Sequence, residues 1–127
     1  MNRRAWLISA FVVAIPIAYL GVRVATSPGI VDTKMDRARY EVILLSDALE
    51  DYRKEHGRYP TTEEGLLDLV RVGLLRAVPV DPWQRPYEYR FPGSRNAAAF
   101  DVWSYGADGK AGGVAEDKDI GNWGDDA

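Results

Sequence analysis

The chain has 127 residues, a net charge of −3 and no cysteine, and these properties exclude several classes of protein. This length suffices for one domain, and a mildly acidic chain without a basic stripe cannot displace counterions from phosphates, which argues against nucleic-acid binding. The lack of cysteine excludes disulfides, thiolate zinc sites and cysteine nucleophiles, and it leaves the redox compartment open.

An uncharged apolar run follows two arginines near the N-terminus and extends over residues 5–22. About 20 apolar residues cross a bilayer as a helix, and tilt or a thinned membrane accommodates a slightly shorter run. The arginines would stay on the cytoplasmic side and place everything after Arg23 on the opposite side. A cleaved secretory signal is the alternative, but a cut after Ala25 would place Arg23 at position −3. We therefore expect a membrane anchor in residues 1–30 and a second domain in residues 31–127.

Apolar residues at spacings of four and three predict an amphipathic helix from Asp36 to Gly57. Charged residues lie off this stripe, and basic residues in the last turn suit the negative end of the helix dipole. Together with the apolar run before it, this helix predicts one long N-terminal rod with an apolar face. That face packs either inside the domain or against sister helices. Its members are Ala38, Val42, Leu45, Leu49 and Tyr52.

The middle of the chain predicts a short helix followed by extended segments. Thr61 and Glu64 have the spacing of a capping box, and Gly73 is expected to end the helix that they begin. Three prolines in residues 79–86 predict turn and extended chain. Residues 87–91 and 100–105 alternate as half-buried strands do, and they most simply pair as an antiparallel hairpin on the helix stripe. The chain is thus predicted to be α+β.

The segment from Gly106 to Trp123 combines five glycines with four acidic residues. A calcium ion takes about six to eight oxygens and requires tight bends of the chain, which glycine permits at no steric cost. The spacing matches neither an EF-hand nor the Gly-Gly-x-Gly-x-Asp repeat. A metal loop and a solvated turn with scattered acids therefore both remain open, and Trp123 is expected to anchor the far end. The candidate metal ligands are Asp108, Asp117, Asp119, Glu116 and the backbone carbonyl of Tyr105.

The remaining polar residues do not predict an enzyme. His56 is the single histidine, and near a helix end it is expected to be a capping or surface residue. Asp81 precedes a proline and a tryptophan, which favours a turn over an acid catalyst. No base, nucleophile and oxyanion donor assemble in the pattern, so we expect no catalytic residues.

Three segments resemble a known family in order and in spacing. "YRKEHGRYPTTEEGL", "DPWQRPYEYRFPG" and "SYGADGKAGGVAEDKDIGNW" are similar to signature segments of the major pseudopilin of type II secretion systems, over residues 38–123. The resemblance implies a pilin-like fold with a long N-terminal helix, transmembrane and then amphipathic, packed on a small antiparallel sheet. It also implies a single-pass protein of the bacterial inner membrane whose C-terminal domain lies in the periplasm.

The resemblance further implies a function and a cofactor. Subunits of this family polymerise into a pseudopilus that drives protein export across the outer membrane, so the implied partners are sister pseudopilin subunits, other secretion-system components and the inner membrane. A calcium ion in the C-terminal loop is linked to folding and assembly in the family. The matching motif positions support Asp108 and Asp119 best as ligands, whereas Asp117 occupies a more variable position.

The N-terminal segment departs from the family pattern. Pseudopilins begin with a Gly-Phe-Thr-Leu-hydrophobic-Glu junction that the prepilin peptidase cuts, and residues 1–22 contain neither this junction nor an acidic residue. Our leading hypothesis is a structural subunit that polymerises into, or caps, the pseudopilus. The alternatives are a membrane-tethered, non-polymerising calcium-binding interaction module with a pilin-like fold, and a secreted calcium-binding domain released by signal cleavage.

Overall fold

A computed structural model of the chain describes residues 33–124, which all lie in one compact unit, Val31–Ala127. The expected membrane anchor in residues 1–30 and the first part of the expected rod lie outside the described residues. Among residues 33–124, no helix combines the length and the apolar character that crossing a membrane requires.

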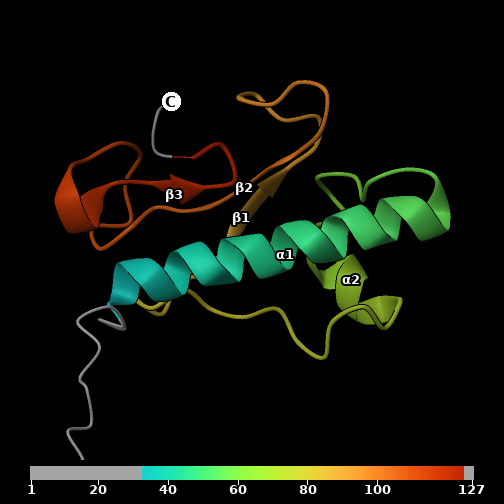
Figure 1. Cartoon of the computed structure of the whole chain (residues 1–127), viewed down its shortest axis with the longest axis horizontal. Coiled ribbons are helices and arrows are strands. Elements are labelled where there is room, and N and C mark those ends of the chain that lie inside the picture. Colours follow the sequence, from blue (N-terminus) through green and yellow to red (C-terminus); the bar gives the residue numbers. More distant parts are fainter. Residues whose placement is uncertain (1–32, 125–127) are drawn as a thin grey trace, which may run out of the picture. The chain divides into compact units, whose positions relative to one another are not determined.

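A long helix, α1 (Lys34–His56), forms one layer of this unit (Figure 1). It begins two residues before the predicted start because Thr33 caps it, with its Oγ1 accepting a hydrogen bond of 3.1 Å from the backbone N–H of Asp36. It ends at Gly57, which adopts a left-handed φ of 75° and donates its N–H to the carbonyl of Arg53. The predicted stripe is confirmed, since all five of its residues are buried.

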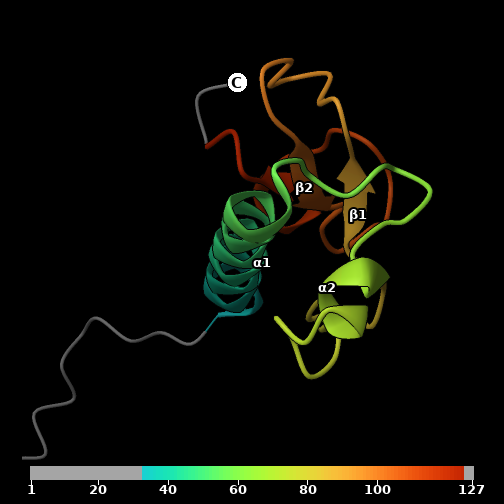
Figure 2. The same ribbon diagram turned by 90° about the vertical axis from the view of Figure 1, so that its right-hand side faces the viewer.

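The second layer is a small antiparallel sheet of three strands in the order β1-β2-β3. Its strands are β1 (Glu88–Arg90), β2 (Asp101–Ser104) and β3 (Ile120–Gly121). The predicted hairpin is confirmed, and Tyr89 of β1 lies opposite Val102 of β2. The sheet lies along one side of α1 in both views, where β2 and β3 contact the helix (Figures 1 and 2). The sequence pattern did not predict β3, which has only two residues.

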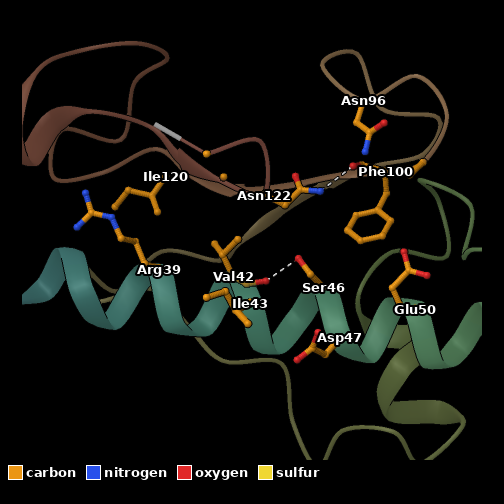
Figure 3. Close-up of a pocket in the computed structure, with 13 residues that line it drawn as sticks. Arg39, Val42, Ile43, Ser46, Asp47, Glu50, Asn96, Phe100, Ile120 and Asn122 are labelled. Carbon is orange, nitrogen blue, oxygen red and sulfur yellow. Dashed lines mark hydrogen bonds between the residues drawn. The ribbon is translucent and has the colours of Figure 1, made fainter. Parts of the chain in front are cut away.

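Asn122 extends the sheet beyond the end of β3. Its side-chain Oδ1 accepts a hydrogen bond of 3.1 Å from the Val102 N–H, and its Nδ2 donates one of 2.9 Å to the Phe100 carbonyl (Figure 3). Its own backbone N–H donates to the Val102 carbonyl at 3.1 Å. The side chain therefore replaces a strand partner for the buried backbone of β2.

The predicted second helix is shorter than the sequence pattern suggested. The capping box is present, because Thr61 and Glu64 exchange hydrogen bonds of 2.8 and 3.1 Å. Gly65 then turns left-handed with a φ of 63°, so a turn precedes the single short helix α2 (Leu67–Arg71). The prediction was wrong on the length of this helix, since the capping box here closes a turn instead of starting the helix.

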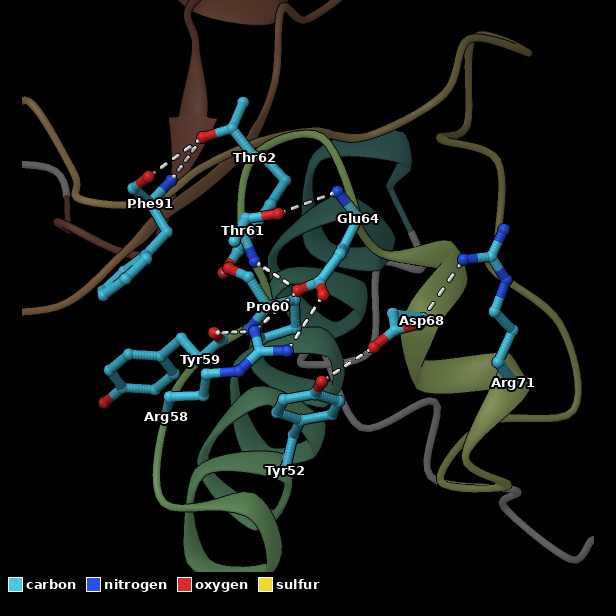
Figure 4. A network of polar contacts seen from close by, with 11 residues as sticks. Tyr52, Arg58, Tyr59, Pro60, Thr61, Thr62, Glu64, Asp68, Arg71 and Phe91 are labelled. Atoms are coloured by element: carbon cyan, nitrogen blue, oxygen red, sulfur yellow. Dashed lines mark hydrogen bonds and ion pairs between the residues drawn. The ribbon is translucent and has the colours of Figure 1, made fainter.

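Polar contacts connect the capped turn and α2 to α1 and to the end of β1 (Figure 4). The Arg58 guanidinium binds the Glu64 carboxylate through two hydrogen bonds of 2.7 and 2.9 Å. The Tyr52 hydroxyl of α1 donates to Asp68 of α2 at 2.7 Å, and Thr62 exchanges two hydrogen bonds of 3.0 Å with the backbone of Phe91 after β1. These contacts together join α1, α2, the capped turn and the end of β1.

Candidate functional site

The C-terminal loop connects β2 to β3 and contains the candidate metal ligands. It leaves β2 after Ser104, includes one short helical turn, η2 (Ala115–Asp117), and enters β3 at Ile120. The Ala107 N–H donates to the Glu116 carbonyl at 2.8 Å, which joins the first leg of the loop to the last. The segment that composition alone could assign to a disordered tail is therefore a closed loop.

Two glycines explain how the backbone closes so tightly. Gly106 has a φ of 69°, and a Cβ at this position would lie 2.7 Å from the Lys118 carbonyl oxygen and 2.8 Å from that of Glu116. Gly113 has a φ of 93°, and its Cβ would collide with the carbonyl of Asp117. Only glycine tolerates both the left-handed backbone and this close approach. Backbone carbonyl oxygens therefore lie close to the two glycines.

Asp119 is the candidate ligand that is most enclosed by the loop. Its Oδ2 accepts a hydrogen bond of 3.0 Å from the Gly112 N–H. Its Oδ1 is buried and has no hydrogen-bond partner among the described residues. A buried carboxylate oxygen without a partner is costly, and a cation would satisfy it. This orphaned oxygen, beside a loop rich in backbone carbonyls, matches the oxygen donors that calcium prefers.

The other predicted ligands lie in more open positions. Asp108 is exposed and accepts a hydrogen bond of 3.0 Å from the Lys110 N–H, whereas Glu116 and Asp117 are exposed on η2. Tyr105 is half-buried and lines a hollow of about 190 Å³ together with Asp119. Within residues 33–124, no three acidic or histidine side chains lie close enough together to hold a metal ion. The structure thus brings Tyr105 and Asp119 together, and it leaves the remaining three acids apart.

Trp123 packs its ring over Gly121 at the far end of the loop. The ring centroid lies 6.0 Å from that of Trp103 on β2, and the Arg95 guanidinium lies 4.4 Å above the Trp123 ring, within the range of a cation–π contact. These contacts attach the end of the loop to the sheet and to the connection between β1 and β2.

Two buried aspartates that were not predicted as site residues accept hydrogen bonds that fix the backbone near the loop. Asp81 accepts a hydrogen bond of 2.7 Å from the Ser104 hydroxyl, whose oxygen in turn accepts one of 3.1 Å from the Gly106 N–H. Asp101 holds the β1–β2 connection, because its carboxylate accepts three backbone hydrogen bonds of 2.8 to 3.1 Å and one from the Ser94 hydroxyl. The Asp-Pro turn motif was the only sequence signal for Asp81, and none marked Asp101.

The ionisation of Asp101 follows from these contacts. Burial disfavours the charged form, but the hydrogen bonds from the backbone N–H groups of Arg95, Asn96 and Ser94 outweigh it and hold the pKa of Asp101 below its usual value. The carboxylate is therefore charged at neutral pH while it is almost fully shielded from solvent.

A groove of about 470 Å³ lies between α1 and the chain segment that includes β3 and Asn122 (Figure 3). Val42, Phe100 and Ile120 contribute apolar surface to it, and Asp47 and Glu50 contribute carboxylates. Among the described residues, no histidine, lysine or tyrosine lines the groove. His56 instead packs edge-on against Tyr52, with 4.3 Å between the ring centroids, as expected for a histidine at a helix end.

Comparisons with known proteins agree on one family. The family model described as type II secretion system protein G matches residues 28–123. The type II secretion system core protein G of Pseudomonas aeruginosa is 39% identical over 103 residues, and the match covers 71% of each chain. The core protein G of Dickeya chrysanthemi is 32% identical over 141 aligned residues, and the match covers 97% of this chain and 89% of the relative. The crystal structure of the major pseudopilin of enterohaemorrhagic Escherichia coli superposes with a TM-score of 0.59 at 34% identity, over 71% of this chain and 86% of that one.

Proposed function

Because this chain belongs to the type II secretion system protein G family, with the pilin-like fold of a major pseudopilin, we propose that it polymerises as a structural subunit of the pseudopilus and that calcium stabilises its C-terminal loop. The resemblance noted in the sequence is thereby confirmed. The family assignment favours the structural subunit over the tethered, non-polymerising module. A subunit of this kind acts through assembly, and we propose no catalytic step.

The calcium part of the proposal rests on the buried Oδ1 of Asp119, which has no hydrogen-bond partner among the described residues. Asp119 would supply the enclosed carboxylate, and the backbone carbonyls near the loop glycines would supply neutral oxygens. Asp108, Asp117, Glu116 and the Tyr105 carbonyl remain the further proposed ligands. When bound, calcium would supply positive charge that offsets the desolvation of the carboxylate and draws the two legs of the loop together.

Thermal unfolding of the full-length chain in detergent tests this part. Calcium should raise the Tm relative to the chelated protein, because a ligand that binds only the folded state stabilises it by mass action. Asp119→Asn removes the charge at nearly constant shape and should abolish the rise, whereas Asp51→Asn, an exposed acid on α1, should retain it. Equal Tm values with calcium and with chelator would contradict the proposal.

We also propose that residues 1–30 anchor the chain in the inner membrane, with residues 31–127 in the periplasm. The apolar run over residues 5–22 and the arginines before it support this orientation. Alkaline carbonate extraction of native membranes tests the anchor, because an embedded helix resists extraction. The chain should remain in the membrane pellet, and its release into the supernatant would contradict the anchor.

A further inference from the structure

One arginine outside the loop contacts several backbone groups at the loop entrance. Arg85 lies in the Pro-rich segment before β1, and its position follows from a tight turn that begins at Asp81. The Gln84 N–H donates to the Asp81 carbonyl at 2.9 Å, and the Asp81 N–H donates to the Arg85 carbonyl at 2.7 Å. The buried Asp81 carboxylate also accepts the Arg85 N–H at 2.8 Å. These bonds fix the backbone from which the Arg85 side chain extends.

The Arg85 guanidinium binds two consecutive carbonyls of the loop. Its Nη1 donates to the carbonyl of Gly106 at 2.9 Å and to that of Ala107 at 3.1 Å, and its Nη2 donates to Ala107 at 3.2 Å. Gly109 lies directly beside the guanidinium, because a Cβ on Gly109 would be 2.6 Å from Nε and 2.7 Å from Cζ. A single side chain thus contacts the first leg of the loop, residues 106–109, at three of its four positions.

The Asp81 turn also holds the start of this leg, through Ser104. The Gly106 N–H donates to Ser104 Oγ, which itself donates to Asp81. Arg85 directly, and Asp81 through Ser104, thus hold this leg with the chain's own groups. The second leg, residues 112–119, differs, because it contains the unpartnered oxygen of Asp119.

We infer that Arg85 is a positioning residue that acts as a fixed internal cation and orders the first leg of the loop before calcium binds. The ordering of this leg stands on the contacts above, and its effect on calcium binding rests on the proposed function. A leg that is already ordered loses no further conformational freedom when the ion binds, so the ion has only the second leg to order. Arg85 also binds the carbonyls of Gly106 and Ala107, so the ion would take its oxygens from the other proposed ligands, Asp119 first among them.

Two effects of Arg85 on calcium affinity oppose one another, and their balance can be measured. Its positive charge repels a cation and lowers affinity, whereas its ordering of the leg raises affinity. Fixing one residue of backbone corresponds to a factor of about ten in an equilibrium constant. Arg85 is partly exposed, so water screens part of its repulsion of the ion. The ordering effect therefore dominates, and removing Arg85 weakens calcium binding.

The experiment compares four forms of the full-length chain in detergent: the unaltered protein, Arg85→Gln, Arg85→Lys and Arg90→Gln. Arg90 is exposed on neighbouring β1 and lines the hollow beside Asp119, so Arg90→Gln removes the same charge near the loop. Hydrogen exchange in the presence of chelator reports on the amides of Gly106 and Ala107, and calcium titration gives the affinity. The amides of α1 serve as a check that each variant remains folded.

Arg85→Gln should speed exchange at Gly106 and Ala107 without calcium and should weaken calcium binding about tenfold, whereas Arg90→Gln should leave exchange unchanged. Arg85→Lys should not restore protection, because a single ammonium group cannot reproduce the planar fork that binds both carbonyls. Unchanged exchange in Arg85→Gln, full restoration by lysine, or tighter calcium binding would each overturn the inference. If the unaltered chain binds no calcium, the proposed function fails on that point, and the exchange measured with chelator still decides whether Arg85 orders the leg.

Discussion

At the scale of single residues, three aspartates with shielded carboxylate oxygens differ in how those oxygens are satisfied. Asp81 and Asp101 each have hydrogen-bond donors on both oxygens, so their charges are compensated by the fold itself. Asp119 has a donor on one oxygen only. This contrast separates the two structural carboxylates from the one that remains available to a ligand.

The sequence could predict some of these residues and not others. The glycine-and-acid pattern and the family motif both indicated Asp119 as a candidate ligand, because a calcium loop needs acidic side chains for ligands and glycines for tight bends. Asp101 and Asn122 gave no such signal, since their roles depend on backbone groups that only the folded chain brings to them. Asp101 occupies an outward position in a strand pattern and yet is buried, because the β1–β2 connection folds over it.

Asn122→Ala should lower the free energy of unfolding by about 1–3 kcal/mol. The substitution leaves the N–H of Val102, a fully buried residue, without its hydrogen-bond partner, and a buried donor without a partner costs about this much. Urea unfolding followed by circular dichroism measures the change. Asn96→Ala is the matched control, because Asn96 is exposed and contributes its backbone N–H to the Asp101 carboxylate. A loss in Asn122→Ala no larger than in the control would contradict this role.

At the scale of elements, the long helix and the hairpin follow from periodicity, whereas the short elements do not. The stripe of α1 repeats over about four turns, from Ala38 to Tyr52, which is long enough to identify a helix from its period. In contrast, α2 has five residues and β3 has two, and neither is long enough to establish a period. Gly65 illustrates the limit, because its left-handed conformation separates a correctly predicted capping box from the helix that the box was expected to begin.

The capped turn before α2 should make stability depend on pH in the acidic range. The hydrogen-bonded Arg58 guanidinium, and then the backbone N–H of Thr61, lower the pKa of Glu64 from its ordinary 4.5 to about 2. A lowered folded-state pKa means that the ionised carboxylate stabilises the folded chain above pH 4.5 and that this stabilisation is lost as the pH falls towards 2.

Thermal unfolding between pH 6 and pH 2 measures this dependence. Because acid also protonates other carboxylates of the chain, the informative quantity is the difference in Tm between the unaltered chain and Glu64→Gln. This difference in Tm should be largest near neutral pH and should shrink as the pH falls. Glu63→Gln, at the exposed neighbouring position, provides the control. A difference that stays constant with pH would show that the Arg58–Glu64 pair contributes no pH dependence.

At the scale of the whole molecule, the described part of the chain consists of a scaffold and the C-terminal loop attached to it. The scaffold consists of α1, the sheet and the capped turn. Their buried apolar side chains form one hydrophobic cluster, which includes Ala38 of α1 and Ile120 of β3. The loop is closed by backbone contacts, held at its entrance by Arg85 and held at its end by Trp123. Among the described residues, the buried Oδ1 of Asp119 inside the loop has no hydrogen-bond partner. Under the proposed calcium function, an ion bound at this oxygen would order this part of the domain surface.

The most direct test of a cation in the loop is terbium luminescence, since terbium(III) is a hard cation with a preference for oxygen ligands similar to that of calcium. Trp103, Tyr105 and Trp123 line the hollow beside Asp119, so excitation of these rings should transfer energy to an ion bound there. In the full-length chain in detergent, we predict terbium emission that calcium displaces and that Asp119→Asn abolishes, while Asp51→Asn preserves it. An absence of sensitised emission, or emission that persists undiminished in Asp119→Asn, would contradict a calcium site in this loop.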